Sequence, residues 1–316
     1  MPDHSDDSAG SCCPHRSGTS PAPVASSHDL SVFETAPPPR ISIEGGMAQI
    51  GTDKIVIAED EEGPPRSVTV KAFQIDATTV TNQRFRQFVD ATGYVTEAER
   101  FGWSFVFYTD VPEDITQTQG VLRTPWWRRV DGADWRRING PETEQAWHPD
   151  HPVVQVSWND ANAFAHWAQG ELPSEAQWEH AARGGRDNVE YPWGNRAPDD
   201  DAFQPCNIWQ GRFPETNSGA DGYLRTAPAQ SFAPNDFGLY NMCGNVWEWT
   251  RNPYRLRSLR KSARARERAM AGYKISKGGS FMCHVSYCFR YRIAARNGNS
   301  PDSTSPHQGF RLVYPG

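Results

Sequence analysis

The stretch KGGSFMCHVSYCFRYRIAARNGNSPDS, from Lys277 to Ser303, holds the most reactive side chains of the sequence. Cys283 and Cys288 lie five residues apart behind a Gly-Gly-Ser turn, and three arginines follow at positions 290, 292 and 296. Structural zinc takes four ligands, and the segment adds only His284, so a zinc site is not expected. A disulfide would close a small loop and would be reduced in a cytosol. Two thiolates suit Cu(I), and the arginines and turn amides favour thiolate, so the residues leave Cu(I) and a redox dithiol open.

The composition predicts an irregular domain rich in loops and aromatic side chains. The 316 residues include 12 Trp, 10 Tyr, 15 Phe, 26 Gly and 25 Pro, while only 37% are hydrophobic, which argues against a layered α/β sheet. The net charge of -6 gives no reason to expect a nucleic acid or an anionic membrane as partner. No apolar run is long enough to cross a bilayer. We therefore expect no nucleic-acid partner and no membrane partner.

Residues 1–39 and 40–316 differ sharply in character. The first segment is rich in Ser, Pro, Asp and His, so we predict a disordered polar tail before a single domain of residues 40–316. Cys12 and Cys13 in this tail are either a mobile thiol reagent, a metal scavenger or incidental residues. The start lacks the basic and apolar regions of a secretory signal, and six cysteines are few for a disulfide scaffold. Both features predict a cytoplasmic protein.

Regular secondary structure is expected mainly in the first part of the domain. The pattern predicts a strand over 67–76 and helices over 81–93, 159–170 and 173–185. Thr81 should cap the first helix, and Ser174 with Gln177 should form a capping box on the third. Periodicity then almost disappears for 100 residues. The basic segment 251–268 is expected to be a solvated loop or short helix, or else a rim that attracts an acidic partner chain.

Two segments offer oxygen ligands of the kind that Ca²⁺ prefers. One set comprises Asn207 and Asp221 with the carbonyl groups of Ile208 and Tyr223. The other comprises Asn241, Gly244, Val246 and Glu248. Neither matches an EF-hand loop, and on the residues alone ordinary Asx turns explain both sets equally well or better.

The order of the motifs resembles the formylglycine-generating enzymes, also called sulfatase-modifying factors. The matching segments run nearly from Ile41 to Val313, and they are GYVTEAERFGWSFVF (93–107), PWWRRVDGADWR (125–136), HPDHPVVQVSWNDA (148–161), LPSEAQWEHAARGG, YPWGN, NIWQGRFPETNSGADGY, GLYNMCGNVWEWT and the quoted cysteine stretch with GFRLV. Trp-Glu-Trp and the final GFR recur across the wider superfamily with this fold. The CHxSYCxRYRxAAR block is instead similar to catalytically competent members.

The resemblance implies a fold, a reaction and a set of site residues. The fold would be α+β, an irregular variant of the C-type lectin fold with little regular secondary structure. The reaction would convert a cysteine in a Cys-x-Pro-x-Arg segment of a sulfatase to Cα-formylglycine with O₂, on an unfolded or nascent chain. By resemblance, Cys283 and Cys288 would hold Cu(I), and the enzyme would act as a monomer. Three further residues would assist: Trp247 and Ser280 at the oxygen pocket, and Tyr287 by hydrogen bonding.

The same resemblance makes both oxygen-ligand sets calcium sites: Asn207, Ile208, Asp221 and Tyr223, then Asn241, Gly244, Val246 and Glu248. Two other functions remain open. A metal-free dithiol oxidase would work through a disulfide between Cys283 and Cys288, and chelators would not affect it. A non-catalytic, lectin-like paralogue would be expected to lack the cysteine pair, which this chain keeps.

Overall fold

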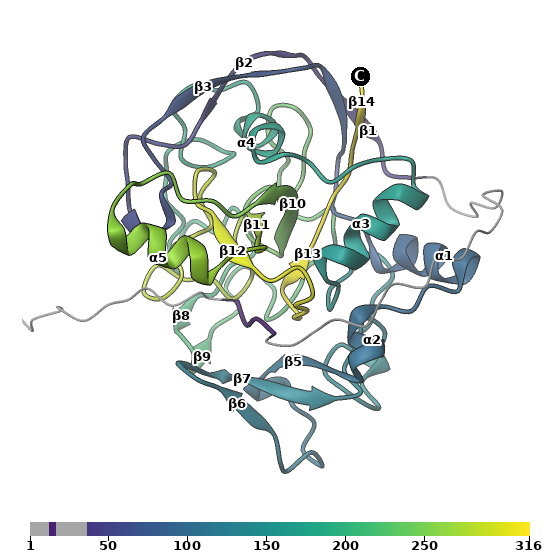
Figure 1. Ribbon diagram of the computed structural model, residues 1–316. Helices are drawn as coiled ribbons and strands as arrows, with labels where there is room; N and C mark the ends of the chain where they lie inside the picture. Colours follow the sequence, from purple (N-terminus) through teal and green to yellow (C-terminus); the bar gives the residue numbers. More distant parts are fainter. Residues whose placement is uncertain (1–12, 17–36) are drawn as a thin grey trace, which may run out of the picture.

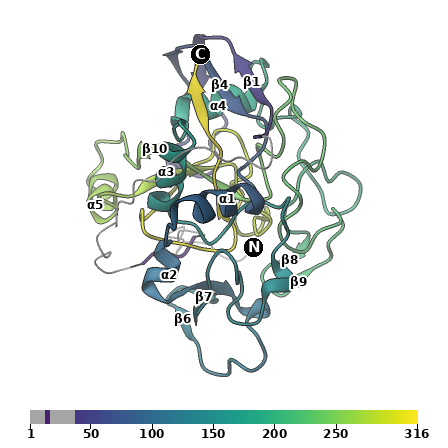
Figure 2. The same cartoon turned by 90° about the vertical axis from the view of Figure 1, so that its right-hand side faces the viewer.

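The computed structural model describes residues 13–16 and 37–316, whose strands form several small sheets in place of one large one. Figures 1 and 2 place the sheet β1-β4-β14 at the top of the molecule and β5-β7-β6 at the bottom. Among the described residues, the helices are α1 (Asn82–Thr92), α2 (Glu97–Phe101), α3 (Trp158–Trp167), α4 (Glu175–Arg183) and α5 (Lys261–Ala269), with short 3-10 helices at Ala58–Asp60, Tyr108–Asp110 and Glu144–Ala146.

The strands pair mostly antiparallel. The sheet near the top contains β1 (Arg40–Ile43), β4 (Phe73–Asp76) and β14 (Val313–Pro315). The central sheet has the order β12 (Asn297–Asn299), β11 (Lys274–Lys277), β10 (Trp247–Pro253) and β13 (Gln308–Gly309), with β10 and β13 parallel. The others are β2 (Gly46–Ile50) with β3 (Arg66–Val70), the sheet of β5 (Trp103–Phe107), β7 (Thr124–Asp131) and β6 (Gln119–Val121), and β8 (Gly211–Arg212) with β9 (Thr216–Asn217).

The three predicted helices are confirmed, and their ends follow the expected capping residues. Thr81 Oγ1 accepts a hydrogen bond from the Arg84 amide at the start of α1, and Gly93 ends that helix with φ 63°. Ser174 and Gln177 form the reciprocal capping box of α4. The strand predicted over 67–76 is instead two strands in different sheets. Val70 and Phe73 are both buried, so the alternation changes phase between them and the chain changes sheet.

Aromatic side chains form much of the core, as the composition predicts. Phe85 on α1 packs against Phe164 on α3, with ring centroids 5.8 Å apart, and edge-on against Trp135. Phe310 completes this cluster at 5.3 Å from Phe164. Rings in these offset and edge-to-face arrangements attract each other beyond their burial of area. The cluster joins the helices on the right of Figure 1 to the central sheet.

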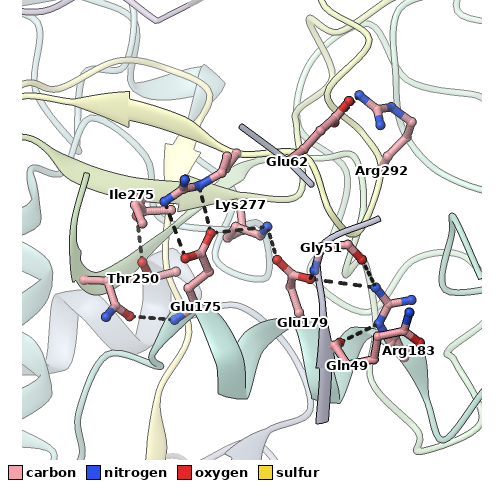
Figure 3. A network of polar contacts seen from close by, with 12 residues as sticks. Gln49, Gly51, Glu62, Glu175, Glu179, Arg183, Thr250, Ile275, Lys277 and Arg292 are labelled. Atoms are coloured by element: carbon pink, nitrogen blue, oxygen red, sulfur yellow. Dashed lines mark hydrogen bonds and ion pairs between the residues drawn. The ribbon is translucent and has the colours of Figure 1, made fainter. Parts of the chain in front are cut away.

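A buried polar network attaches α4 to strand β11 (Figure 3). The Lys277 Nζ atom lies 2.8 Å from Glu179 Oε1, and both side chains are essentially unexposed. The other Glu179 oxygen accepts a hydrogen bond from the Gly51 amide, while Arg183 donates to the Gly51 carbonyl. Because buried charges require partners, this network fixes the end of β11. The cysteine segment begins directly after that end.

Two polar segments, residues 13–16 and the basic segment 251–268, make contacts with the rest of the domain. Residues 13–16 of the predicted tail lie against the domain, with Cys13 and Arg16 buried, while residues 1–12 and 17–36 lie outside the described part. The basic segment forms the end of β10 and helix α5, and α5 has no buried residues. Arg266 donates to the Glu59 carbonyl, and Glu61 accepts hydrogen bonds from the Arg257 and Ser258 amides. The acidic partner of this segment is therefore the loop at 59–61 of the same chain.

Within the described residues, no helix combines the length and the apolar character required to cross a membrane.

Candidate active site around Cys283 and Cys288

The loop after β11 is held in one conformation by its glycines and backbone hydrogen bonds. Gly278 and Gly279 adopt φ values of 92° and 71°, and a Cβ atom on Gly279 would lie 2.8 Å from Cα of Tyr291. The Cys283 amide then donates to the Ser280 carbonyl, and the Cys288 amide donates to the His284 carbonyl. These two turns direct both cysteine side chains into the same buried space.

Cys283 and Cys288 form a pair of buried thiols. Their Sγ atoms lie 3.0 Å apart, well beyond the roughly 2.05 Å of a covalent S–S bond. Each residue is 1% exposed and belongs to an apolar cluster with Trp247, Tyr191 and Cys206. Two soft sulfur donors in a dry site fit a soft monovalent ion such as Cu(I). No cluster of three or more His, Cys, Asp or Glu able to hold a metal occurs in residues 13–16 and 37–316.

Ser280 and Trp247, which the family resemblance assigns to an oxygen pocket, lie beside this pair. The Ser280 Oγ atom is 4.0 Å from Cys283 Sγ and 3.0 Å from His307 Nδ1. Trp247 is fully buried, and its amide donates to the His307 carbonyl. The indole N–H of Trp247 has no acceptor among the described residues, so a buried donor is available in the apolar cluster. His307 is thus a site residue whose role the sequence did not reveal.

Tyr287 stands at the edge of the pair in an aromatic wall. Its ring stacks on Phe213 with centroids 4.1 Å apart and meets Trp126 edge-on at 5.0 Å. The wall borders a surface hollow of about 560 Å³ that Trp126, Tyr108 and Arg128 help to line. Packing therefore fixes the orientation of the Tyr287 ring next to Cys288.

Buried ion pairs secure the arginines that follow the cysteines. Arg290 donates to both carboxylate oxygens of Asp60, and one of its Nη atoms lies 4.0 Å from Cys288 Sγ. Arg292 pairs with Glu62 at 2.7 Å, two residues further along both segments. The loop around 58–62 therefore supplies the negative charges that pair with the arginines of the cysteine segment. Asp60 and Glu62 escaped the sequence analysis because their partners lie 230 positions away.

The first oxygen-ligand set is assembled around Asp221. Its carboxylate accepts hydrogen bonds from the Ile208 amide at 3.0 Å and the Tyr223 amide at 2.9 Å. The buried Oδ1 atom of Asn207 accepts no hydrogen bond from any described residue. Burial raises the pKa of Asp221, a penalty on its charged form that a bound cation would offset. This set fits a calcium ion.

The second set is built around Asn241 and Glu248. Asn241 again has a buried Oδ1 atom that accepts nothing from the described residues, while its Nδ2 donates to the Ala229 carbonyl. Glu248 also takes part in a buried ion pair: its oxygens accept from Arg311 at 2.7 and 2.8 Å, and one also accepts from Trp178. A carboxylate offers about four lone-pair sites, so these contacts do not decide whether it binds a cation. Glu248 as a calcium ligand, with Gly244 and Val246, stays a prediction.

Comparison with known proteins places this site in a family. Residues 27–315 match the family described as "Sulfatase-modifying factor enzyme 1-like domain". The chain belongs to this sulfatase-modifying factor family. The formylglycine-generating enzyme of Thermomonospora curvata is 48% identical over 86% of this chain and 92% of its own length. That of Streptomyces coelicolor is 47% identical over 80% and 82% respectively.

Solved structures confirm the irregular α+β fold of the family. PvdO from Pseudomonas aeruginosa aligns with a TM-score of 0.60 at 21% identity, over 88% of this chain and 95% of that chain. CarF aligns with a TM-score of 0.52 at 22% identity.

Overall identity does not separate active from inactive family members. A Bos taurus relative named "Inactive C-alpha-formylglycine-generating enzyme 2" is 42% identical over 86% of this chain. The Bos taurus formylglycine-generating enzyme is 45% identical over 88%. Because these values are so close, activity has to be argued from the site residues, and above all from the two buried thiols.

Proposed function

We propose that this chain oxidises a cysteine within a Cys-x-Pro-x-Arg segment of a sulfatase to Cα-formylglycine, with O₂ as oxidant and copper held by Cys283 and Cys288. The observation that carries the proposal is the buried thiol pair with Sγ atoms 3.0 Å apart. The names of the family and of its most similar members support the reaction and the sulfatase substrate. Copper bound by the thiolates would supply the redox chemistry that couples cysteine oxidation to reduction of O₂.

Residues around the two thiols would exclude water, transfer protons and position the reacting groups. Trp247 excludes water from the site and offers its buried N–H as a donor to a reduced oxygen species. Ser280 Oγ lies between Cys283 Sγ and His307 Nδ1, so a proton at the serine hydroxyl can pass to or from the imidazole. Tyr287 is held next to Cys288 by its stack on Phe213, and its hydroxyl would assist by hydrogen bonding.

Calcium is proposed at both oxygen-ligand sets, as a structural ion. Asn207, Ile208, Asp221 and Tyr223 would hold one ion, and Asn241, Gly244, Val246 and Glu248 would hold the other. The second set leads directly into Trp247, so an ion there would fix one wall of the pocket. Hard oxygen donors without a hydrogen-bonded ladder between them are typical of calcium-stabilised loops.

We further propose that the protein acts as a cytoplasmic monomer on an unfolded or nascent sulfatase chain. Among the described residues, the buried cysteines 206 and 243 have no disulfide partner, which suits a reducing compartment. A sulfatase cysteine in its folded enzyme would not reach thiols that are 1% exposed, so an extended segment is the fitting substrate.

The test is aldehyde formation on a synthetic Cys-x-Pro-x-Arg peptide under air, followed by mass spectrometry. We expect aldehyde with copper-loaded enzyme and none with Cys283→Ser or Cys288→Ser. The 3.0 Å separation also favours a second candidate, a metal-free dithiol oxidase, since a disulfide needs only about 1 Å of further approach. Aldehyde made by metal-free enzyme would select that candidate. No aldehyde from folded, copper-loaded enzyme would leave a binding protein with the family's fold.

A further inference from the structure

The chain carries a short segment of its own beside the cysteine pair. Cys13 is 2% exposed and belongs to the same apolar cluster as Cys283, Cys288 and Trp247. The segment 13–16 is the short purple piece near the middle of Figure 1, far in sequence from everything around it. A polar segment gains this degree of burial only when specific contacts offset its loss of hydration and of chain entropy.

Pro14 is anchored through its carbonyl group. That oxygen accepts hydrogen bonds from Asn299 Nδ2 at 3.1 Å and from Ser303 Oγ at 2.7 Å. The next residue, His15, lies with its ring 5.7 Å from the ring of Tyr273. When a protein binds an extended segment through the backbone of that segment, neighbouring pockets can bind the side chains of the segment and provide specificity.

Arg16 fills the most specific of these pockets. Its guanidinium lies 4.2 Å from the ring centroid of Phe101 and 4.3 Å from that of Trp103. One Nη atom donates to the Trp103 carbonyl at 2.6 Å and to Thr304 Oγ1 at 2.9 Å. Burial lowers the pKa of Arg16 to about 10, and the carboxylates of Asp302, Glu97 and Asp160 partly offset this by favouring its positive charge. Two aromatic faces, two acceptors and a negative field recognise an arginine in particular.

The sequence of this segment matches the substrate pattern of the proposed function. Residues 12–16 read Cys-Cys-Pro-His-Arg, which is Cys-x-Pro-x-Arg with Cys12 in the place of the reacting cysteine. Cys12 itself lies outside the described residues. Pro14 and Arg16, the two other fixed positions of the pattern, are the residues whose contacts have just been given.

We propose that residues 13–16 act as an intramolecular pseudosubstrate, which occupies the place of the sulfatase segment and competes with it. This inference rests on the proposed function for the substrate pattern, and on the contacts of residues 13–16 for their position. It assigns Cys13 to the neighbourhood of the cysteine pair.

Covalent attachment sets the strength of this competition. A tethered ligand acts at an effective concentration on the order of millimolar, so even modest contacts hold it in place. The apparent dissociation constant of a free peptide rises in inverse proportion to the fraction of molecules with an open groove. A tail bound in roughly 90 to 99% of molecules would thus weaken peptide binding about 10- to 100-fold.

The experiment measures peptide binding without turnover. A fluorescent Ser-x-Pro-x-Arg peptide is titrated by anisotropy with the full chain and with its Arg16→Ala variant. We expect the variant to bind at least tenfold more tightly, because its own tail no longer fills the arginine pocket. Arg40→Ala is the matched control: that guanidinium also lies over a ring, 3.5 Å from the centroid of Tyr314, at the far end of the molecule. It should leave the affinity unchanged.

Hydrogen exchange on the same proteins tests the placement directly. Residues 101–104 and 299–304 should exchange faster in Arg16→Ala than in the full chain or in Arg40→Ala. Equal exchange, or faster exchange with an unchanged peptide affinity, overturns the inference. Aldehyde formation on a cysteine peptide decides the proposed function separately. If Arg16→Ala binds the peptide more tightly but no aldehyde forms, only the proposed function is contradicted. If aldehyde forms but the affinity of Arg16→Ala is unchanged, only the pseudosubstrate proposal is contradicted.

Discussion

Replacing Glu248 by Gln should destabilise the protein strongly and weaken its calcium response. In the structure, Arg311 and Glu248 are 0% and 1% exposed. One Glu248 oxygen accepts from Trp178 and from Arg311 Nε, and the other accepts from Arg311 Nη2. Glutamine can keep the first oxygen, but it places an NH₂ donor against Arg311 Nη2. The buried guanidinium then has no counter-charge.

The size of the effect follows from this geometry. Removing one partner of a buried ion pair typically costs about 3 to 5 kcal/mol. At about 2 °C per kcal/mol for a protein of this size, Tm should fall by about 6 to 10 °C. The matched control is Glu215→Gln, which makes the same change in the exposed pair with Arg212, 2.7 Å apart. Exposed pairs contribute about 0 to 1 kcal/mol, so this variant should melt within about 2 °C of the parent.

The assay is calorimetry in EDTA and in saturating Ca²⁺. A ligand at 100 times its dissociation constant stabilises by about 2.7 kcal/mol, which should raise Tm by about 5 °C. We expect this calcium-dependent rise in the parent, and a smaller rise in Glu248→Gln and in Asn241→Ala. A Glu248→Gln variant that is as stable as the parent in EDTA would refute the reasoning about the ion pair, and a full calcium response in that variant would exclude Glu248 as a ligand.

Three further outcomes are expected. Asn207→Ala should lose the calcium ion held with Asp221, seen as one fewer bound ion by isothermal titration, and an unchanged stoichiometry would contradict that site. Tyr287→Phe keeps the stack on Phe213, so Tm should hold while aldehyde formation slows about two- to tenfold through the lost hydroxyl contact; equal rates would exclude that contact. Burial, with Glu97 nearby, raises the pKa of Asp160 from 3.8 to about 6, so the folded state holds this proton more tightly than the unfolded state. Stability should therefore be greatest below pH 4 on this account and decline by on the order of 3 kcal/mol as the pH rises through 6, and melting curves of Asp160→Asn should lack this part of the slope.

Local elements of the fold could be predicted because their signals lie within a few residues. The Thr81 cap, the Ser174 capping box and Gly93 each act on the next turn of chain, and all three are confirmed. The break between β3 and β4 was also readable, since the spacing from Val70 to Phe73 changes the phase of a period of two. A single strand over 67–76 does not contain this phase change, so that prediction was wrong in joining the two strands.

The candidate site was predictable where one short segment supplies the chemistry, and not where distant segments meet. Cys283, Cys288 and Ser280 share one loop, so their neighbourhood followed from the sequence. The pairing of Arg290 with Asp60 joins positions 230 apart, and sequence spacing carries no information about it. The Glu248–Arg311 pair could not be predicted for the same reason, because nothing near Glu248 in sequence reveals Arg311 as its partner.

The sheet near the top of Figure 1 has a consequence for synthesis on the ribosome. Its middle strand β4 is flanked by β1, which begins at residue 40, and by β14, which ends at residue 315. Until residues 313–315 emerge, one side of β4 exposes unpaired backbone groups, the kind of edge that invites association between nascent chains. Completion of the domain is thus tied to release of its last strand. A short C-terminal linker should let the ribosome-bound chain finish folding, and a stall before residue 313 should not.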